Sequence, residues 1–319
     1  DGSNTTAALG ANSISIGTGA TLNFNHSADV TVANAIGGAG ALNKLDTHTL
    51  TLTGVSSYTG ATGTGTGTAG GVVYTNNTAP ATSGFTGSGA VTIEPATASF
   101  ASAVGANYTY ATTLTGLILG KVGNLTDMTV DSLVNIAGPI TLYAPHITLN
   151  NGNISTTGGQ TYNGAVILGA NTTLNAGTGD VTLPNLPNQF VGVVSLQANN
   201  VELVASRGLT LGNSTVAGKL AATASTGSIT QIGSLNVAGT SAFTATQGDV
   251  VLAQANAFAQ SVSVHAVNVT LNATSALTLG ASTVTGDLLA HVAQGDLTQT
   301  GPVAVVGKTN FTTVAGDVM

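Results

Sequence analysis

The sequence contains no cysteine and no tryptophan, and only 5% of its 319 residues are charged. Without cysteine the chain forms no disulfide and offers no thiolate to a metal. It has five Lys and Arg residues against twelve Asp and Glu, a net charge of −7. This balance argues against nucleic-acid binding, which needs basic side chains to displace counterions. No apolar run approaches the roughly 20 residues of a membrane helix. No signal peptide opens the chain, which predicts a mature piece or an excised segment.

The residues that are abundant favour β-structure. Apolar residues make up 42% of the chain, so its composition is not that of a disordered protein. Thr, Val, Asn and Gly are frequent, whereas the helix-favouring Glu, Lys, Arg and Met are rare. This mixture predicts short strands separated by tight turns.

The second half repeats itself at an almost constant interval. The word Gly-Asp-Val occurs at 179–181, 248–250 and 316–318. LTLGNSTVAGKL at 209–220 recurs as LTLGASTVTGDL at 277–288, and VAGTSAF at 237–243 recurs as VVGKTNF at 305–311. Self-similarity at a fixed period indicates a repeat architecture. Here it covers roughly residues 165–319.

Small polar residues stand one place before the expected strands at intervals of about 20, 28, 21, 19, 28 and 21 residues. These intervals predict a 68-residue unit of three coils, two of about 20 residues and one of about 28, in a β-solenoid. The rival fold is a string of antiparallel sandwiches. We expect Leu203 with Leu271, and Phe243 with Phe311, at equivalent inward sites three coils apart. The small polar residues that precede the strands, called corner residues below, are Asp180, Asn200, Ser228, Asp249, Asn268, Asp296 and Asp317.

These residues are interpreted as one structural ladder at a corner of the solenoid. Asp, Asn and Ser hydrogen-bond their own backbone in tight turns, and the preceding Gly supplies a positive φ. The alternative is a calcium ladder. Aspartates three coils apart would be separated by about 14 Å, too far to share an ion, so only Asp296 and Asp317 form a candidate calcium pair. We therefore expect no metal site and no cofactor.

Candidate catalytic groups are sparse, and we expect no enzyme. Asp127 and Asp131 on one strand would lie about 13 Å apart, beyond the range of glycosidase carboxylate pairs. Asp287 and His291 have the same spacing. The histidines show no metal-ligand spacing; they are His26, His48, His146, His265 and His291.

The first half carries a resemblance to known families. GGAGALNKLDTHTLTLTGVSSYTGATG at 37–63 resembles the β-strand repeat of autotransporter passengers, except at Asp46-Thr47-His48, where that repeat has a small Gly/Ala turn. VTIEPATASF, LTGLILGKVGN, AGPITLYAPHITLN and TTGGQTYNGAVILGANTTL, between 91 and 174, resemble filamentous-haemagglutinin-like exoproteins of Gram-negative bacteria. The resemblance implies a right-handed parallel β-helix. It also implies export by two-partner or autotransporter secretion, and a place in an adhesin or biofilm matrix at the cell surface.

We expect three regions: N-terminal solenoid coils over 1–63, a Gly/Thr-rich loop or irregular coil over 64–86, and a solenoid shaft over 87–319. An ordered, stacked Thr face is the alternative for the middle region.

The function expected is that of a rigid, non-catalytic shaft in an extracellular adhesin or matrix fibre. The alternative is a carbohydrate-binding face, which would need exposed aromatics on one side. Expected partners are a host or matrix surface, glycans included, and further solenoid. The sequence stops in a Gly-Asp-Val corner, so we expect its last coil to stack on a continuation of the chain or on another copy, giving a filament.

Overall fold

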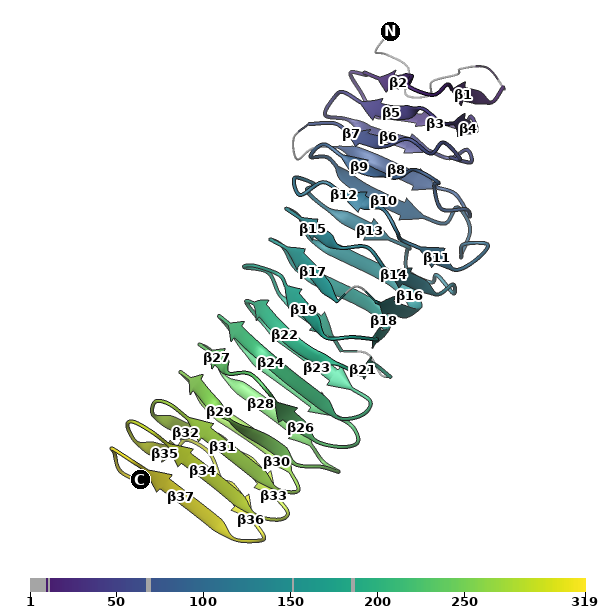
Figure 1. The fold of residues 1–319 in the computed structure, drawn as a ribbon. Coiled ribbons are helices and arrows are strands. Elements are labelled where there is room, and N and C mark those ends of the chain that lie inside the picture. Colours follow the sequence, from purple (N-terminus) through teal and green to yellow (C-terminus); the bar gives the residue numbers. More distant parts are fainter. Residues whose placement is uncertain (1–9, 11, 67–69, 151, 185–186) are drawn as a thin grey trace. The chain divides into compact units, whose positions relative to one another are not determined.

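A computed structural model describes the chain except for residues 1–9, 11, 67–69, 151 and 185–186. All regular secondary structure in the described residues is β-strand. No described segment forms a helix that could cross a membrane. The chain divides into two compact units, unit 1 (residues 1–151 and 155–164) and unit 2 (152–154 and 165–319). Both are all-β, and in each the strands pair in parallel with strands one coil away along the chain, as a β-solenoid requires (Figure 1).

Unit 1 is built mainly of short strands, and β17 and β18 are divided between the two units. The strands are β1 (Ile14–Ile16), β2 (Thr21–Phe24), β3 (Val30–Val32), β4 (Ile36–Gly38), β5 (Ala41–Lys44), β6 (Thr49–Leu52), β7 (Thr62–Thr64), β8 (Gly71–Thr75), β9 (Gly84–Thr86), β10 (Ala90–Glu94), β11 (Val104–Gly105), β12 (Thr109–Tyr110), β13 (Leu117–Leu119), β14 (Met128–Val130), β15 (Val134–Ile136), β16 (Ile140–Leu149), β17 (Asn153–Thr156) and β18 (Gln160–Leu168).

One sheet of unit 1 stacks β3, β6, β8, β10, β13 and β16, and another stacks β2, β5, β7, β9 and β12. Coil length varies here. Val30 pairs with Leu50, whereas Val91 pairs with Leu117, so the second of these coils is the longer one. Loops of different length between the strands absorb this variation, so no fixed period is visible in this part of the sequence.

The described part of the Gly/Thr-rich stretch at 64–86 is ordered, where a loop or irregular coil was expected. β8 pairs with both β6 and β10, and β7 pairs with β9. A cluster of buried hydroxyls explains how so polar a stretch fills a core. The Thr62 hydroxyl lies 2.7 Å from that of Tyr58 and 2.8 Å from that of Tyr74, and the two tyrosine hydroxyls lie 2.5 Å apart. Thr82 extends the cluster, so these buried oxygens are hydrogen-bonded.

The strands of unit 2 are longer and more regular. They are β19 (Thr172–Asn175), β20 (Val181–Leu183), β21 (Gln189–Phe190), β22 (Val193–Ala198), β23 (Val201–Ala205), β24 (Leu209–Val216), β25 (Leu220–Ala224), β26 (Ile229–Gln231), β27 (Leu235–Val237), β28 (Ser241–Ala245), β29 (Val250–Phe258), β30 (Val262–Ala266), β31 (Val269–Ala273), β32 (Leu277–Leu279), β33 (Ser282–Val284), β34 (Leu288–Val292), β35 (Leu297–Gln299), β36 (Val303–Val305) and β37 (Thr309–Thr313).

Two sheets run through unit 2. The first sheet stacks β20/β21, β23, β25, β28, β30, β32/β33 and β35/β36. The second sheet stacks β19, β22, β24, β26/β27, β29, β31, β34 and β37. From β20 onwards the chain crosses from one sheet to the other at each turn, and one coil comprises two crossings.

Strands of two kinds alternate in unit 2. Single strands, such as β23 and β25, run straight without a break. Divided strands consist of two short runs around a bend: β26 and β27 are separate strands, and β24 pairs with both of them. The alternation is interrupted twice, where the single strand β22 is followed directly by β23 and where β30 is followed directly by β31.

These interruptions determine the geometry of the repeat. From β23 to β30 the chain forms seven strands, single or divided, and the eighth, β31, is the repeat equivalent of β23. Seven is odd, so β23 lies in the first sheet and β31 in the second. A repeat unit is therefore three and a half coils, and successive units present the same residues on opposite sheets.

This half-turn corrects the expected three-coil unit. Leu203 and Leu271, and Phe243 and its equivalent Phe311, occupy inward positions, but the first member of each pair lies in the first sheet and the second in the second sheet. The 28-residue interval is one coil of 19 residues, from Asn200 to Lys219, plus a further half coil. All strand pairing in the described register is parallel, as a solenoid predicts and a string of antiparallel sandwiches does not.

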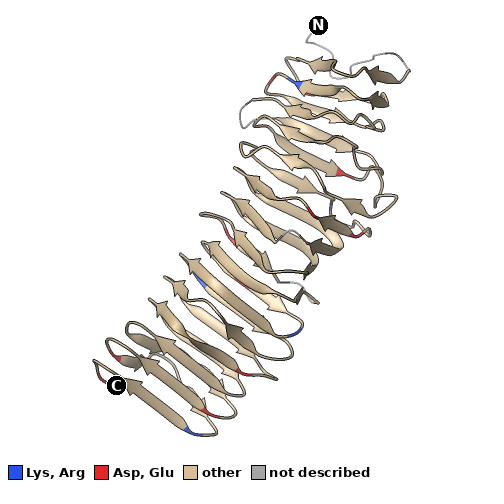
Figure 2. Cartoon of the chain, in the orientation of Figure 1, with Lys and Arg blue, Asp and Glu red and all other residues tan. Residues whose placement is uncertain are grey.

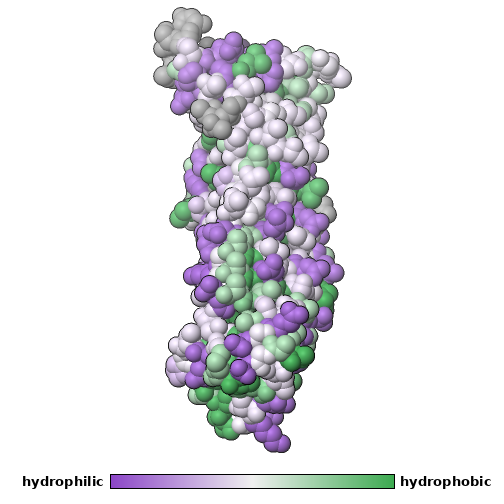
Figure 3. Space-filling model, turned by 90° about the vertical axis from the view of Figure 1, so that its left-hand side faces the viewer, coloured by the Kyte–Doolittle hydropathy of each residue, from purple (hydrophilic) through white to green (hydrophobic). Residues whose placement is uncertain are grey.

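The core of unit 2 is formed by alternate residues of each strand. In β23, Val201, Leu203 and Ala205 are buried, while Glu202 points outward. Small Ala, Val and Leu side chains suit this interior because adjacent coils lie only about 4.8 Å apart. The outward positions hold mainly Thr, Ser, Ala and Asn, and Figure 3 shows a mixed surface on the side that it displays.

The last coil differs in exposure. Phe243 is 1% exposed, whereas its repeat equivalent Phe311 is partly exposed, and the nearby Val306 is 81% exposed. Stacking of a further coil or another copy on this surface stays a prediction.

Candidate functional site

The predicted corner residues do precede strands, but they form three sets rather than one ladder. Asp180 and Asn200 lie at the first sheet and are followed there by Lys219. A second set at the second sheet consists of Ser228, Asp249, Asn268, Asp287 and Lys308. Asp296 and Asp317 form a third set, again at the first sheet. The half-turn repeat explains the split, because a step of one repeat moves a corner to the opposite sheet.

Within each set one hydrogen bond recurs. The backbone N–H of each corner residue donates to the side-chain oxygen of the corner residue one coil earlier. Asp249 N–H donates to Ser228 Oγ (3.0 Å), Asn268 N–H to Asp249 Oδ1 (3.0 Å), and Asp287 N–H to Asn268 Oδ1 (2.9 Å). Figure 2 shows the acidic residues of unit 2 mostly in such turns. The side chains thus link the backbone of successive coils.

The Asp180 carboxylate is held in this role electrostatically. The hydrogen bond from the Asn200 N–H lowers the pKa of Asp180, and the side-chain amides of Asn199 and Asn200 and the Lys219 ammonium lower it further. The corner carboxylate therefore stays ionised and keeps accepting hydrogen bonds.

The glycine before a corner residue has the expected positive φ at Gly227 (81°), which precedes Ser228, and at Gly295 (85°), which precedes Asp296. Gly248, which precedes Asp249, does not have a positive φ. A Cβ at Gly248 would instead clash with the carbonyl oxygen of Gly227 in the preceding coil. Glycine permits a close approach of two backbones here, rather than a left-handed turn.

Asp296 and Asp317, the candidate calcium pair, lie in adjacent coils, as their spacing in the sequence allows. Asp317 N–H donates to Asp296 Oδ1 at 2.9 Å, and Leu297 and Val318 form a bridge beside them. Within the described part of the chain, no three His, Cys, Asp or Glu residues gather closely enough to hold a metal ion.

The candidate catalytic residues are engaged with neighbouring coils. Asp127 Oδ1 lies 2.9 Å from His146 Nδ1, and Asp131 Oδ1 accepts a hydrogen bond from the side chain of Asn150. Asp287 accepts the N–H of Lys308, and His291 Nδ1 lies 2.9 Å from the Thr312 hydroxyl.

Asp46-Thr47-His48, where the sequence differs from the autotransporter repeat, belongs to a compact polar cluster in unit 1. Asp46 accepts hydrogen bonds from the backbone N–H groups of His26 (2.8 Å) and His48 (2.7 Å). The buried Lys44 ammonium lies 3.3 Å from the Asp46 carboxylate and donates to the Asp46 carbonyl. Burial alone raises the pKa of the Asp46 carboxyl, but these hydrogen bonds and the Lys44 charge outweigh burial and lower it. Where the autotransporter repeat has a small Gly/Ala turn, this chain therefore has a turn whose charged and polar groups bond to one another.

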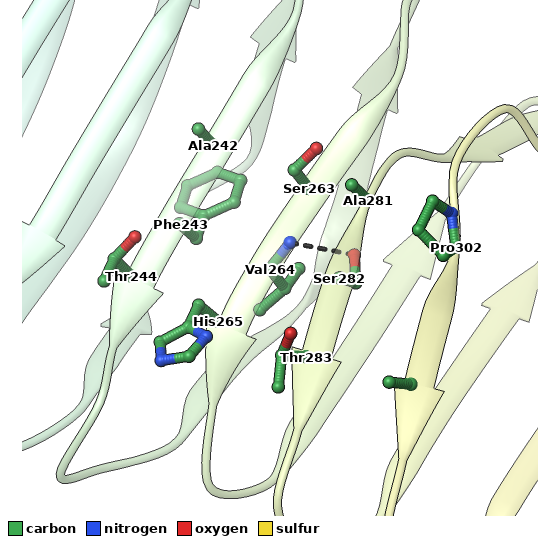
Figure 4. Close-up of a pocket in the computed structure, with 11 residues that line it drawn as sticks. Ala242, Phe243, Thr244, Ser263, Val264, His265, Ala281, Ser282, Thr283 and Pro302 are labelled. Atoms are coloured by element: carbon green, nitrogen blue, oxygen red, sulfur yellow. Dashed lines mark hydrogen bonds between the residues drawn. The ribbon is translucent and has the colours of Figure 1, made fainter.

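Two shallow surface grooves lie on opposite sheets of unit 2. The groove in Figure 4 has a volume of about 340 Å³ and is lined by Ser263, His265, Thr283 and neighbouring residues of the first sheet. The other, of about 370 Å³, is lined by Ser195, Asn213 and neighbouring residues of the second sheet. Ser195 and Ser263 are repeat equivalents. The grooves thus occur at equivalent points of successive units.

Comparison with known protein families accounts for this recurrence. A family described as repeats of unknown function (DUF5649) matches residues 129–197, 198–265 and 266–319. The chain belongs to the DUF5649 family. No curated protein and no solved structure shows a significant similarity to it. The DUF5649 repeats begin at residue 129, further toward the N-terminus than the repetition recognised from about residue 165.

In the DUF5649 repeat 198–265, single and divided strands stack on each other at two places, and a buried polar side chain, Ser214 or Asn256, lies at each mismatch. Where the divided strand β24 stacks on the single strand β22, the pairing register shifts. There the Ser214 hydroxyl accepts the Leu196 N–H (3.2 Å) and donates to the Gly212 carbonyl (3.0 Å). One repeat later Ser282 makes the same two contacts, with Val264 and Gly280.

The opposite mismatch is occupied by an asparagine. Asn256 lies in the bend of β29, is fully buried, and faces the single strand β31 of the next coil. Its Oδ1 accepts the Leu235 N–H (2.9 Å), and its Nδ2 lies within hydrogen-bond distance of the Leu252 (3.2 Å) and Asn272 (3.0 Å) carbonyls.

Asn188, one repeat earlier in the chain, makes the equivalent contacts with Val166, Leu183 and Val204. Sequence reasoning did not single out these residues, although a polar residue that recurs with the repeat among apolar ones is a signal that could have identified them.

Proposed function

We propose that the chain is a structural segment: a rigid, non-catalytic β-solenoid shaft in an extracellular adhesin or biofilm-matrix fibre of a Gram-negative bacterium. The observation that carries the proposal is the regular stacking of the DUF5649 repeats. Successive coils are joined by parallel backbone pairing, by corner hydrogen bonds and by buried Asn and Ser residues at the mismatches. An arrangement of this kind transmits force and holds distance, because each coil is bonded to its neighbours along the stack.

The polar side chains support a structural role rather than catalysis. Asp127, Asp249 and Asp287 are bonded to the neighbouring coil, and the grooves on the sheets are shallow and open. The freedom from cysteine suits export as an unfolded chain, since a disulfide would obstruct passage. Together with the resemblance to secreted solenoids, this supports export by two-partner or autotransporter secretion, a position at the cell surface, and partners among host or matrix components or further solenoid.

A test of the shaft is to insert a second copy of residues 198–265 after residue 265. The inserted repeat adds three and a half coils, so the maximum dimension measured by small-angle X-ray scattering should increase by about 17 Å. The cross-sectional radius should stay the same. Growth of the cross-section without growth in length would contradict a shaft.

The extracellular position has a separate test. Antibodies raised against the chain should label intact cells of the bacterium that produces it, and protease added outside those cells should remove the label. Labelling that appears only after the cells are permeabilised would contradict surface exposure.

A further inference from the structure

A hollow of about 350 Å³ lies on the surface of unit 1, beside a turn that runs from Lys121 to Thr126. The turn contributes Val122 and Leu125, the strand β16 contributes Tyr143 and Ala144, and β18 contributes Asn163. All of these residues belong to the same compact unit. The hollow is distinct from the corner sets and from the grooves of unit 2.

The turn is fixed in place by hydrogen bonds. The Asn124 side-chain amide donates to the carbonyls of Thr126 (3.0 Å) and Tyr143 (2.9 Å). Leu125 N–H donates to Ser99 Oγ (2.6 Å), and the Lys121 ammonium donates to the Pro95 carbonyl (2.7 Å). Nevertheless the turn leaves Val122 81% and Leu125 77% exposed. Two aliphatic side chains are thus held rigidly in solvent, where they contribute nothing to the core.

Tyr143 is unusual among the aromatic residues of this chain. Of thirteen aromatics ten are buried, and Tyr110 and Phe311 face inward. Tyr143 alternates with the buried Leu142 and Ala144 on β16, and therefore points outward with its ring partly exposed. An outward aromatic ring presents an apolar face and a polar hydroxyl at the surface.

The surroundings of the ring leave space and offer polar groups. Gly120, which has no side chain, lies beside Tyr143 in the preceding coil, and a Cβ there would clash with the Tyr143 backbone. Asn163 is exposed, and within the described residues its amide makes no hydrogen bond. Among the described residues the Lys121 ammonium makes one hydrogen bond with its three donors, which leaves two N–H groups for a ligand.

We propose that this hollow is a saccharide-binding site. One face of a pyranose ring, which carries C–H groups, packs on the Tyr143 ring between Val122 and Leu125, and its hydroxyls bond to the Asn163 amide and the Lys121 ammonium. Such sites combine an apolar surface with a few convergent polar groups in a volume of this order.

The same residues fit other partners less well. An anionic membrane would require a cluster of basic side chains, and among the described residues that line the hollow Lys121 is the one basic residue. A peptide added as a strand would need an unpaired sheet edge. β16 pairs with β13 and β14 along one edge, and on the other edge the Ile140 N–H donates to the Gly159 carbonyl. The site goes beyond the structural role proposed above and does not depend on it.

The test uses the whole chain of 319 residues. It is screened on a glycan array, and saturation-transfer difference NMR is recorded with the methyl glycosides of mannose, galactose, N-acetylglucosamine and glucuronic acid. Selective saturation transfer to one pyranose face is expected from at least one of these probes. Tyr143→Ala should weaken binding about tenfold or more, and Tyr143→Phe, which keeps the ring, should stay within about threefold.

Asn163→Ala should weaken binding by about three- to tenfold because one hydrogen bond is lost. Thr141→Ala, at the outward position two residues before Tyr143, is the matched control and should bind as the unchanged chain does. The proposal is overturned if no array glycan or glycoside binds, or if Tyr143→Ala, still folded by circular dichroism, binds equally well. It is also overturned if the chain binds phosphatidylglycerol vesicles through Val122 and Leu125 in place of the sugars. None of these outcomes alters the scattering test of the shaft.

Discussion

Replacing Asn256 by alanine should lower the free energy of unfolding of its part of unit 2 by about 3–5 kcal/mol. Asn256 is fully buried, and its side chain is bonded to the backbone of Leu235, Leu252 and Asn272, in its own coil and in both neighbouring coils. Alanine leaves these buried groups without partners, and each unsatisfied group costs about 1–3 kcal/mol. Urea titration, together with hydrogen exchange of the amides in β26–β31, measures the loss.

The matched control is Asn236→Ala on β27. Asn236 is exposed, so its replacement should change the stability by no more than about 0.5 kcal/mol. Asn188→Ala, one repeat earlier, should cost about as much as Asn256→Ala. Equal effects of Asn236→Ala and Asn256→Ala would show that the buried asparagine does not hold the mismatched strands together.

Phe243→Ala should also cost about 3–5 kcal/mol, the usual range for removing a buried phenylalanine. Phe243 is 1% exposed and packs against Phe258, with ring centroids 6.3 Å apart. Its repeat equivalent Phe311 occupies the same inward position but is partly exposed in the last coil. Phe311→Ala should therefore cost about 1 kcal/mol or less in this chain.

Differential scanning calorimetry and urea titration of both variants decide the point. A loss for Phe311→Ala as large as that for Phe243→Ala would contradict the difference in burial between the two coils and would show that Phe311 is covered in solution, as head-to-tail stacking predicts.

Periodicity predicted the fold class because hydrophobic alternation and a constant repeat length follow directly from coils that stack. Periodicity could not predict on which of the two sheets each repeat begins. The 28-residue intervals were interpreted as one long coil, whereas each is a coil plus a half coil, since Asn200 is followed one coil later by Lys219 and then by Ser228 at the opposite sheet. A corner residue looks the same in sequence whichever sheet it precedes.

Side-chain partners across coils were beyond sequence reasoning for a related reason. The recurring aspartates were correctly placed before strands, but their acceptor role depends on which residue lies one coil away. Gly248 was expected to have a positive φ, which it does not have. Glycine is required there because a Cβ would clash with the Gly227 carbonyl oxygen of the adjacent coil. Likewise Tyr74 and Thr82 of the Gly/Thr-rich region join Thr62 in a buried hydroxyl cluster, where composition alone predicts a loop.

The half-turn relation between successive DUF5649 repeats is tested most directly by paired cysteines in this cysteine-free chain. Thr270 and Leu289 pair in adjacent strands of the second sheet and both point outward, whereas Thr298 lies in the first sheet. Neighbouring parallel strands lie about 4.8 Å apart, within the Cα separation of a disulfide. Mild oxidation should therefore cross-link the Thr270→Cys, Leu289→Cys variant and leave Thr270→Cys, Thr298→Cys reduced. Cross-linking of the 270–298 pair in place of the 270–289 pair would restore a three-coil repeat and contradict the half-turn.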